Sequence, residues 1–404
     1  MTLWGTPVTL DYNHRAVSET PQALLDPFRE YGDVVWLPKL NRWLVLSQPA
    51  AMETLRNSSL QVLKRRDMAL RLEDQVGLNL AALSSVLNWI PFSHDGARHS
   101  DLREAFGRLL TSITADYLKA YEDVSSELLE KMRVAEQGDF ATGYADRLHL
   151  EIVGRFIGVP PSERQKLACH TALDGFILNN ASVREIRDAN TQLAAILETV
   201  HALISSGQSS PFLEKVGDAL RQTGLEDTPT SRSECIVALI VLGDDTQAGA
   251  LTVGLASMLD ACDGALCLDA ADNGLPKGQS LVDEVLRIAS PVKNSARYAT
   301  EDTMICGHAI AKGENVTLSF QAANFDPKAF PCPHMLKDGR RGHVAFGGAR
   351  HLCTAMPLVR KTLAITFRHL ATIGRIEARP GRQLAACLTV HRYEHLPIRI
   401  VPEP

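Results

Sequence analysis

The pattern of hydrophobic and polar residues predicts a chain that is mostly helical in its middle part. Hydrophobic residues recur at helical spacing over much of 50–261. Turn-forming residues interrupt this pattern at 88–96, 158–163, 205–211 and 226–233. Residues 32–47 differ, because two β-rich runs flank a Lys-Leu-Asn turn, which predicts a hairpin. We therefore expect a mainly α protein with small β-sheets.

One predicted helix is hydrophobic on nearly every face. It begins at Ser231, the first residue of an S-R-S-E capping box, and ends before the Asp-Gly pair at 263–264. About thirty residues at a rise of 1.5 Å span roughly 45 Å, so this helix can cross the whole molecule as a buried element. Asp244 and Asp245 interrupt it midway. Because buried carboxylates need partners or a cavity, we expect a cavity there.

Composition and charge narrow the class of protein. The chain has 404 residues, of which 45% are hydrophobic and 22% charged, as in ordinary globular proteins. No internal repeat or linker divides it, so we expect one domain over residues 1–404. The net charge of -5 argues against a general nucleic-acid-binding protein, which needs a basic face.

The sequence also bears on location. The N-terminus has no basic segment followed by an apolar core, so no secretory signal is recognised. The longest strongly apolar run, at 236–243, is too short to span a bilayer. We expect a cytoplasmic protein without a membrane partner.

Cys353 stands out among the eight cysteines, which lack a close CxxC pair and are expected to be free thiols. Gly347 and Gly348 allow a tight turn close to its sulfur. The following stretch predicts a helix that begins at the cysteine, with Pro357 in its first turn. A helix N-terminus stabilises a thiolate, which is a good metal ligand. A small buried hydrophobe remains the alternative interpretation of Cys353.

The segment around Cys353 resembles the haem-binding loop of the cytochrome P450 family. The pattern F-G-x-x-x-H-x-C followed by P-L-x-R is matched by Phe346, Gly347, His351, Cys353, Pro357, Leu358 and Arg360. Two positions depart from it, since Ala349 replaces a usual Gly and Ala355 replaces a Gly that often varies to Ala. We expect the first departure to tighten or shift the loop. The resemblance implies a haem b whose iron is bound by Cys353.

The residues before this loop also resemble the family. Glu284 and Arg287 lie three apart in E-V-L-R and alone would suggest only a solvated ion pair. The sequence that follows resembles the family's run from the Glu-x-x-Arg helix to the haem loop. The resemblance implies a structural network of Glu284, Arg287 and Arg340.

Further residues are implied as ligands of the haem carboxylates. Arg297 aligns with an arginine that the family uses on a haem propionate, and guanidinium suits a carboxylate because it donates paired bonds. His99 and Arg103, four apart on a predicted helix face, resemble the family's other propionate-binding pair. His351 is a further expected donor, and His343 is a weaker candidate.

Within the central helix, L-G-D-D-T-Q resembles the family's oxygen-activating stretch. Gly243 is expected to loosen the helix and leave room for oxygen and water, with Asp245 and Thr246 relaying protons. The alternative is that the acids are exposed and Thr246 bonds back to its own helix. Leu242 departs from the family, which usually has Ala or Gly there, and should narrow the space above the haem.

The resemblance covers essentially the whole chain. It implies one triangular-prism domain of the cytochrome P450 fold, with a long central helix over a buried haem. We expect a helical core over 50–290, β-rich regions near 32–47 and 297–320, and a haem-binding loop over 343–360. The implied substrate pocket includes Leu239, Leu242, Val292 and Asn294, with further walls at 78–90, 170–181 and near Thr389. Lys293 or Asn294 could hold a carboxylate or amide.

The expected activity is that of a monooxygenase. It would activate O2 to hydroxylate or otherwise oxidise a small organic substrate, in specialised-metabolite biosynthesis or catabolism. Electrons would come indirectly from NAD(P)H through a ferredoxin reductase and a ferredoxin, and the protein is expected to be a monomer. We expect the ferredoxin to dock on a local basic patch formed by Arg350, Arg360, Lys361, Arg98 and Arg108. The alternatives are a peroxide-using, coupling or isomerising haem-thiolate enzyme and a non-catalytic haem-binding sensor.

Overall fold

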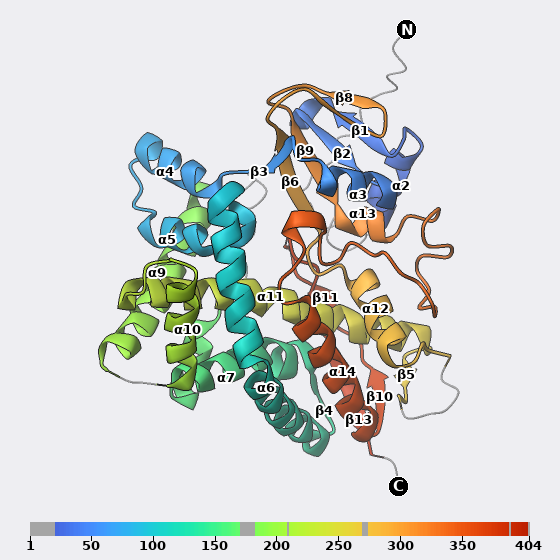
Figure 1. Ribbon diagram of the computed structural model, residues 1–404. Helices are drawn as coiled ribbons and strands as arrows, with labels where there is room; N and C mark the ends of the chain where they lie inside the picture. Colours follow the sequence, from blue (N-terminus) through green and yellow to red (C-terminus); the bar gives the residue numbers. More distant parts are fainter. Residues whose placement is uncertain (1–20, 170–181, 208–209, 269–273, 388, 403–404) are drawn as a thin grey trace.

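Helices dominate the computed structural model, which describes residues 21–169, 182–207, 210–268, 274–387 and 389–402 (Figure 1). The α-helices are α2 (Pro21–Arg29), α3 (Gln48–Arg56), α4 (Arg65–Val76), α5 (Ala81–Trp89), α6 (Gly96–Ala135), α7 (Asp146–Ile157), α9 (Val183–Ser205), α10 (Pro211–Gln222), α11 (Pro229–Ala261), α12 (Gly278–Ala289), α13 (Phe320–Asn324) and α14 (Met356–Thr372). Short 3-10 helices lie at η1 (Pro38–Leu40), η2 (Pro91–Ser93), η4 (Pro161–Leu167) and η5 (Ala349–His351), and η3 (Ala141–Ala145) is a π-helical turn. The prediction of a mainly α protein is confirmed.

The strands are short and form small sheets. They are β1 (Val34–Leu37), β2 (Arg42–Val45), β3 (Leu60–Val62), β4 (Gln137–Asp139), β5 (Ala265–Leu266), β6 (Asn294–Ala299), β7 (Thr303–Ile305), β8 (His308–Ile310), β9 (Asn315–Ser319), β10 (Arg375–Ala378), β11 (Gln383–Leu384), β12 (Tyr393–His395) and β13 (Pro397–Val401). A five-stranded sheet has the order β1-β2-β9-β6-β3, and a four-stranded sheet has the order β4-β13-β10-β5. β1 and β2 form the expected hairpin, whose turn Asn41 closes in the left-handed conformation.

The long helix α11 lies at the centre of the helical part, against α5, α7, α9 and α12. It begins at Pro229, two residues before the predicted start. Thr228 is its N-cap: its Oγ1 accepts the N–H of Ser231, and its own N–H donates to the Ser231 hydroxyl oxygen in return. The predicted capping box is therefore wrong, because Ser231 is already inside the first turn. Glu234 instead accepts a hydrogen bond of 2.7 Å from the Trp89 indole.

Most side chains of α11 are buried by the helices around it. Within the part of the chain that the structure describes, α11 is the one helix with the length and hydropathy of a membrane span. The buried core helix of a globular protein has the same composition, so this finding indicates no membrane by itself.

The Cys353 loop lies where the sheet part and the helical part meet. It follows α13 and leads into α14, which packs against α6 (Figure 1). On the other side, η5 within the loop packs against α3 of the sheet part. The loop is therefore held by elements that are distant in sequence.

Candidate functional site

The loop around Cys353 makes a tight turn that is closed by a hydrogen bond between its own main-chain atoms. Gly347 has a left-handed φ of 68°, and a Cβ there would lie 3.4 Å from the His351 carbonyl. The Cys353 N–H donates to the Phe346 carbonyl at 3.0 Å. The helix α14 begins at Met356, three residues beyond the cysteine rather than at it, with Pro357 in its first turn as predicted.

The Cys353 thiol lies in a setting with opposing electrostatic effects. Burial raises its pKa, while the main-chain amides of Ala355 and Met356 and the charge of Arg103 lower it, and the net direction is upward. The main-chain amides next to the start of α14 therefore stabilise the thiolate as expected, but burial has the larger effect on the pKa of Cys353. A bound cation supplies what is missing, because a coordinated thiol loses its proton outright.

Ala349 adopts a conformation that favours glycine. Its φ is 52°, in the left-handed region, where a Cβ costs roughly 1–2 kcal/mol. Gly348 beside it is extended, and a Cβ there would lie 3.2 Å from Leu55 Cδ1. The loop thus keeps a tight turn although alanine replaces the usual glycine, and the replacement is expected to cost stability.

Two histidines and an aspartate form a compact group beside the loop. The rings of His99 on α6 and His351 lie with centroids 4.3 Å apart. His351 Nε2 and Arg350 Nε both contact Asp95 Oδ1, at 3.0 and 3.1 Å. Burial and the neighbouring His351 lower the pKa of His99 to about 4. The other ring nitrogen of His351, Nδ1, is buried and has no hydrogen-bond partner among the described residues.

Two buried arginines lie near this group. Arg297 on β6 and Arg65 at the start of α4 are 5% and 3% exposed. Burial lowers the pKa of each to about 10, and the charge of Arg297 lowers that of Arg65 further. Arg297 Nη1 donates to the Ser295 hydroxyl and the Ala296 carbonyl. Buried like charges are costly, so the site favours an added anion.

Arg103 serves the loop directly. Its Nη1 donates to the Leu352 carbonyl and, at 3.3 Å, to Thr354 Oγ1. It therefore ties α6 to the residues on either side of Cys353. An open groove of about 730 Å³ runs along this face of α6, lined by Gly96, His99, Ser100, Arg103, Glu104, Gly107, Arg350 and Thr354.

The donor set fits a haem. His99, His351 and Arg297 bring buried cationic or donor groups toward Asp95, and Arg65 lies close enough to Arg297 for their charges to interact. A group with two carboxylates would balance this excess, and it would favour the protonated form of His351, whose unpartnered Nδ1 could then donate to it while Nε2 stays on Asp95. Among the described residues, no cluster of three or more His, Cys, Asp or Glu side chains could hold a bare metal ion.

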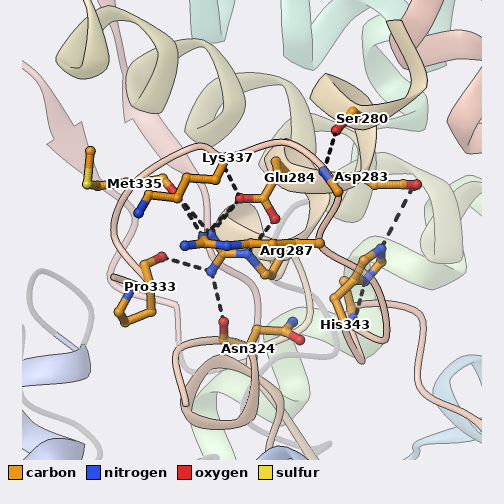
Figure 2. Close-up of polar contacts among 12 residues, drawn as sticks. Ser280, Asp283, Glu284, Arg287, Asn324, Pro333, Met335, Lys337 and His343 are labelled. Carbon is orange, nitrogen blue, oxygen red and sulfur yellow. Dashed lines mark hydrogen bonds and ion pairs between the residues drawn. The ribbon is translucent and has the colours of Figure 1, made fainter. Parts of the chain in front are cut away.

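Glu284, Arg287 and Arg340 come together in a buried network (Figure 2). Glu284 and Arg287 are 1% and 0% exposed and are joined by two hydrogen bonds of 2.8 and 3.0 Å. Arg340 Nη1 donates to the same Glu284 carboxylate at 3.1 Å. Arg287 also donates to the carbonyls of Asn324, Pro333 and Met335. This network fixes the segment that leads to the Cys353 loop, and it is not the solvated ion pair considered from spacing alone.

His343 lies at the edge of this region. Its Nε2 is 4.0 Å from Asp283 Oδ1, and its Nδ1 accepts the Ala345 N–H (Figure 2). These contacts join the loop to α12, so His343 is placed to order the loop.

The Gly243 region of α11 is an unbroken helix. A Cβ on Gly243 would lie 2.4 Å from Cε1 of His149 on α7, so the glycine leaves room for that imidazole. The Thr246 hydroxyl donates to the Leu242 carbonyl at 2.7 Å. The alternative considered above, a back-bonded threonine, thus describes Thr246 in this structure.

The two acids beside Gly243 are inside the molecule rather than exposed. Asp244 is 2% exposed and accepts the Cys169 N–H at 3.3 Å. Asp245 receives Arg392 Nη1 at 2.7 Å, and the same guanidinium contacts Asp146 on α7. Arg392, in the C-terminal segment, therefore forms an ion pair with Asp245, the acid that the resemblance assigns to proton relay.

The implied pocket residues lie in two places. Leu239 and Leu242 are half-buried on α11 and pack against the main hydrophobic core. Val292 is half-buried and pairs with Val390, and Asn294 begins β6. Lys293 is 3% exposed and donates to the Cys387 carbonyl. The wall expected at 170–181 lies outside the described residues.

Most arginines of the expected basic patch have partners of their own. Arg350 pairs with Asp95, Arg360 with Asp283 and Arg108 with Glu104. Arg98 lies over the Trp89 ring and donates to the Asn88 carbonyl. These pairs reduce the positive field that a docking partner would meet.

Several of these residues were not found from sequence. Arg65 and Asp95 belong to no spacing motif that marks a carboxylate site, and His149 is one histidine in an amphipathic helix. Their roles depend on contacts between distant elements. The glycine in the middle of an apolar helix was the available signal for His149, because such a glycine marks a close approach.

Comparisons with known proteins place this geometry in context. The family model described as Cytochrome P450 matches residues 273–340. The steroid C26-monooxygenase of Rhodococcus jostii is 26% identical over 290 residues, which are 70% of this chain and 60% of that protein. The 6-deoxyerythronolide B hydroxylase of Saccharopolyspora erythraea is 25% identical over 324 residues, 76% of each chain.

Solved structures share the fold over nearly the whole chain. The structure of P450BioI in complex with an acyl carrier protein carrying hexadec-9Z-enoic acid has a TM-score of 0.77 at 20% identity, covering 95% of this chain and 100% of that one. The structure of CalO2 has a TM-score of 0.78 at 19% identity, covering 98% and 99%. At such identities the likeness shows the fold.

Proposed function

Since the chain belongs to the cytochrome P450 family, we propose that it is a haem-thiolate monooxygenase that oxidises a small organic molecule with O2. The observation that carries the proposal is the position of Cys353 in a tight loop beside buried donors that suit two carboxylates. A haem b bound there supplies an iron that activates O2 for attack on C–H bonds. The remaining steps belong to side chains of this protein.

The proximal residues hold the cofactor. Cys353 would be the iron ligand, within the turn that Phe346 and Gly347 build and that Arg103 ties to α6. His99, His351 and Arg297 would donate to the haem carboxylates, and Arg65 would add a fourth donor. Because these donors are buried and fixed by Asp95 and Ser295, the carboxylates meet a preformed site.

On the distal side, Gly243, Asp245 and Thr246 handle protons and water. The Thr246 hydroxyl can leave the Leu242 carbonyl and donate toward the oxygen-binding side, since that bond is a single local one. Asp245 takes part in this relay when its carboxylate is released from Arg392. Leu239 and Leu242 with Val292 and Asn294 form the substrate pocket, and Leu242 narrows it.

The substrate and partners follow from the family chemistry. The relatives named above are a steroid C26-monooxygenase and a 6-deoxyerythronolide B hydroxylase, and one structural neighbour is in complex with an acyl carrier protein. We place this protein in specialised-metabolite biosynthesis or catabolism, in the cytoplasm and as a monomer. Electrons from NAD(P)H arrive through a ferredoxin reductase and a ferredoxin that docks near Arg350 and Lys361.

The test compares two ways of driving turnover. Purified holoprotein is screened with small organic ligands by the shift of the haem spectrum, and each ligand that binds is then incubated either with a surrogate ferredoxin, ferredoxin reductase and NADPH or with hydrogen peroxide alone. We expect oxidised product with the electron-transfer proteins and little with peroxide, because Asp245 and Thr246 serve a proton relay. Product from peroxide alone would favour the peroxide-using alternative, and binding without any product would favour a sensor.

A further inference from the structure

A continuous chain of buried hydrogen bonds crosses the helical part behind α11. His369 Nδ1 on α14 lies 2.9 Å from Ser125 Oγ on α6, which lies 2.7 Å from the Tyr144 hydroxyl. The Tyr144 hydroxyl lies 3.0 Å from Thr366 Oγ1, which lies 2.8 Å from the Tyr121 hydroxyl. Three helical elements, α6, η3 and α14, therefore contribute to one uninterrupted line of groups that both donate and accept.

The outer end of this chain opens on a surface groove. His369 is half-buried and lines a depression of about 460 Å³ together with Glu122, Asp123, Ser126, Glu127 and Arg155. The carboxylates of such a groove attract protons and pass them to a neighbouring imidazole. Burial and Arg368 lower the pKa of His369 and Glu122 opposes them, so the imidazole is mainly neutral at pH 7, with one ring nitrogen that can accept a proton and another that carries one.

The inner end reaches the turn of α11 that carries Gly243 and Thr246. The Tyr121 hydroxyl faces the side chain of Gln247, which directly follows Thr246, and Gln247 also faces His149. The Gln247 Nε2 and both ring nitrogens of His149 are buried without a hydrogen-bond partner among the described residues. The chain therefore reaches α11 at Gln247 and His149, which adjoin the turn that carries Gly243 and Thr246.

We propose that this chain, from His369 through Ser125, Tyr144, Thr366 and Tyr121, conducts protons from the surface groove to the oxygen-activating turn of α11. The proposal rests on the proposed function and adds a route separate from the Asp245 side. A proton enters at His369 Nε2 while the Nδ1 proton passes to Ser125. Each hydroxyl then accepts one proton and gives up its own to the next, so that one proton leaves at Tyr121 for each one that enters.

The interior of the chain suits this transfer. Ser125, Tyr144 and Tyr121 are 0% exposed and Thr366 is 1% exposed, so bulk water does not interrupt the line. Burial raises the pKa of Tyr144 to about 12 and that of Tyr121 well above its usual value. The tyrosines therefore stay neutral and pass protons along without becoming charged. A static network that only fixes the packing of these helices is the competing explanation.

Thr366 separates the two explanations because its hydroxyl bonds both the Tyr144 and the Tyr121 hydroxyls. Thr366→Val keeps the shape of the side chain but removes its hydroxyl, whereas Thr366→Ser keeps the hydroxyl and removes the methyl group. Holoprotein of each variant is mixed with a surrogate ferredoxin, ferredoxin reductase and NADPH without substrate. The O2-dependent oxidation of NADPH is measured in H2O and in D2O.

We expect Thr366→Val to slow O2-dependent NADPH oxidation roughly tenfold and to change its solvent isotope effect, with Thr366→Ser close to wild type. The loss is smaller than the 10²–10⁴-fold expected for removing a catalytic acid or base, because water offers a slower route. Formation of the reduced carbonyl complex under anaerobic CO needs no proton and should be equal in all three proteins. The conservative swap Tyr117→Phe, one turn before Tyr121, provides a control outside the chain.

Urea unfolding gives a readout apart from turnover. If the network only stabilises the fold, the NADPH oxidation rate of each variant should follow its urea unfolding midpoint. Thr366→Ser should then lose activity in proportion to the stability that it loses with the methyl group. That outcome, or a wild-type rate in Thr366→Val, would overturn the proton path while leaving the proposed function intact. A wild-type holoprotein that is reduced under CO but oxidises no NADPH with O2 would overturn both.

Discussion

The substitution Arg287→Lys probes the buried network that precedes the Cys353 loop. Arg287 makes five hydrogen bonds: two to Glu284 and one each to the carbonyls of Asn324, Pro333 and Met335. Lysine keeps the positive charge but has three donors on a single nitrogen. At least two of the buried acceptors therefore lose their partner.

The expected cost follows from those lost bonds. An unsatisfied buried polar group costs about 1–3 kcal/mol, so two of them predict a loss of about 4 kcal/mol in the free energy of unfolding. This is a large part of the 5–15 kcal/mol that a folded protein typically has. We expect the variant to unfold at clearly lower urea concentration and to yield less haem-loaded protein, because the network orders the chain that leads into the loop.

The assay is urea unfolding followed by circular dichroism, with Arg368→Lys as the matched control. Arg368 forms an exposed ion pair with Glu122, with both side chains about half exposed, so its replacement should cost no more than about 1 kcal/mol. A loss below about 1 kcal/mol in Arg287→Lys, or equal losses in both variants, would refute the account of the network.

Three further predictions concern the loop and the central helix. Ala349→Gly should raise the thermal midpoint, because φ is 52° at this position and removing the Cβ should add up to about 1 kcal/mol to the free energy of unfolding. An unchanged or lower midpoint would mean that the turn carries no strain. Gly243→Ala should destabilise the protein because its Cβ would lie 2.4 Å from His149 Cε1, and adding His149→Ala should restore most of the loss; equal loss in the double variant would contradict this contact. The pKa of His149 is lowered by burial to about 4, so its neutral form adds stability above its unfolded pKa of 6.5, and up to about 3 kcal/mol is lost as the pH falls toward 4. Urea midpoints measured between pH 7 and pH 4 should therefore fall less steeply in His149→Gln, and parallel curves would refute this assignment.

Motifs with fixed spacing predicted the parts of the site that depend on local sequence. The turn around Cys353 and the position of Pro357 follow from local spacing. The network of Glu284, Arg287 and Arg340 was instead implied by the family resemblance, because spacing alone suggests only a solvated ion pair. The predicted start of α11 at Ser231, the first residue of the S-R-S-E pattern, is wrong, because Thr228 caps the helix and Pro229 is its first residue. Proline at the first helical position was the better signal.

Other features depend on contacts that no short pattern encodes. Arg65, Asp95 and Arg392 acquire their roles when α4, the start of α6 and the C-terminal segment meet residues far along the chain. The same holds for the hydroxyl chain, whose members lie on separate helical elements. The Thr246 hydroxyl is predicted to act in the proton relay, but in the structure it donates to the Leu242 carbonyl, one turn earlier in its own helix.

The most direct test of the central claim is the absorption spectrum of the reduced carbonyl complex of the haem-loaded protein. If Cys353 binds the iron as a thiolate, the wild-type protein shows the strongly red-shifted Soret band of a thiolate-bound haem, and Cys353→Ser loses that band. A wild-type protein without the red-shifted band, or a Cys353→Ser variant that keeps it, would contradict the assignment of Cys353 and the function built on it.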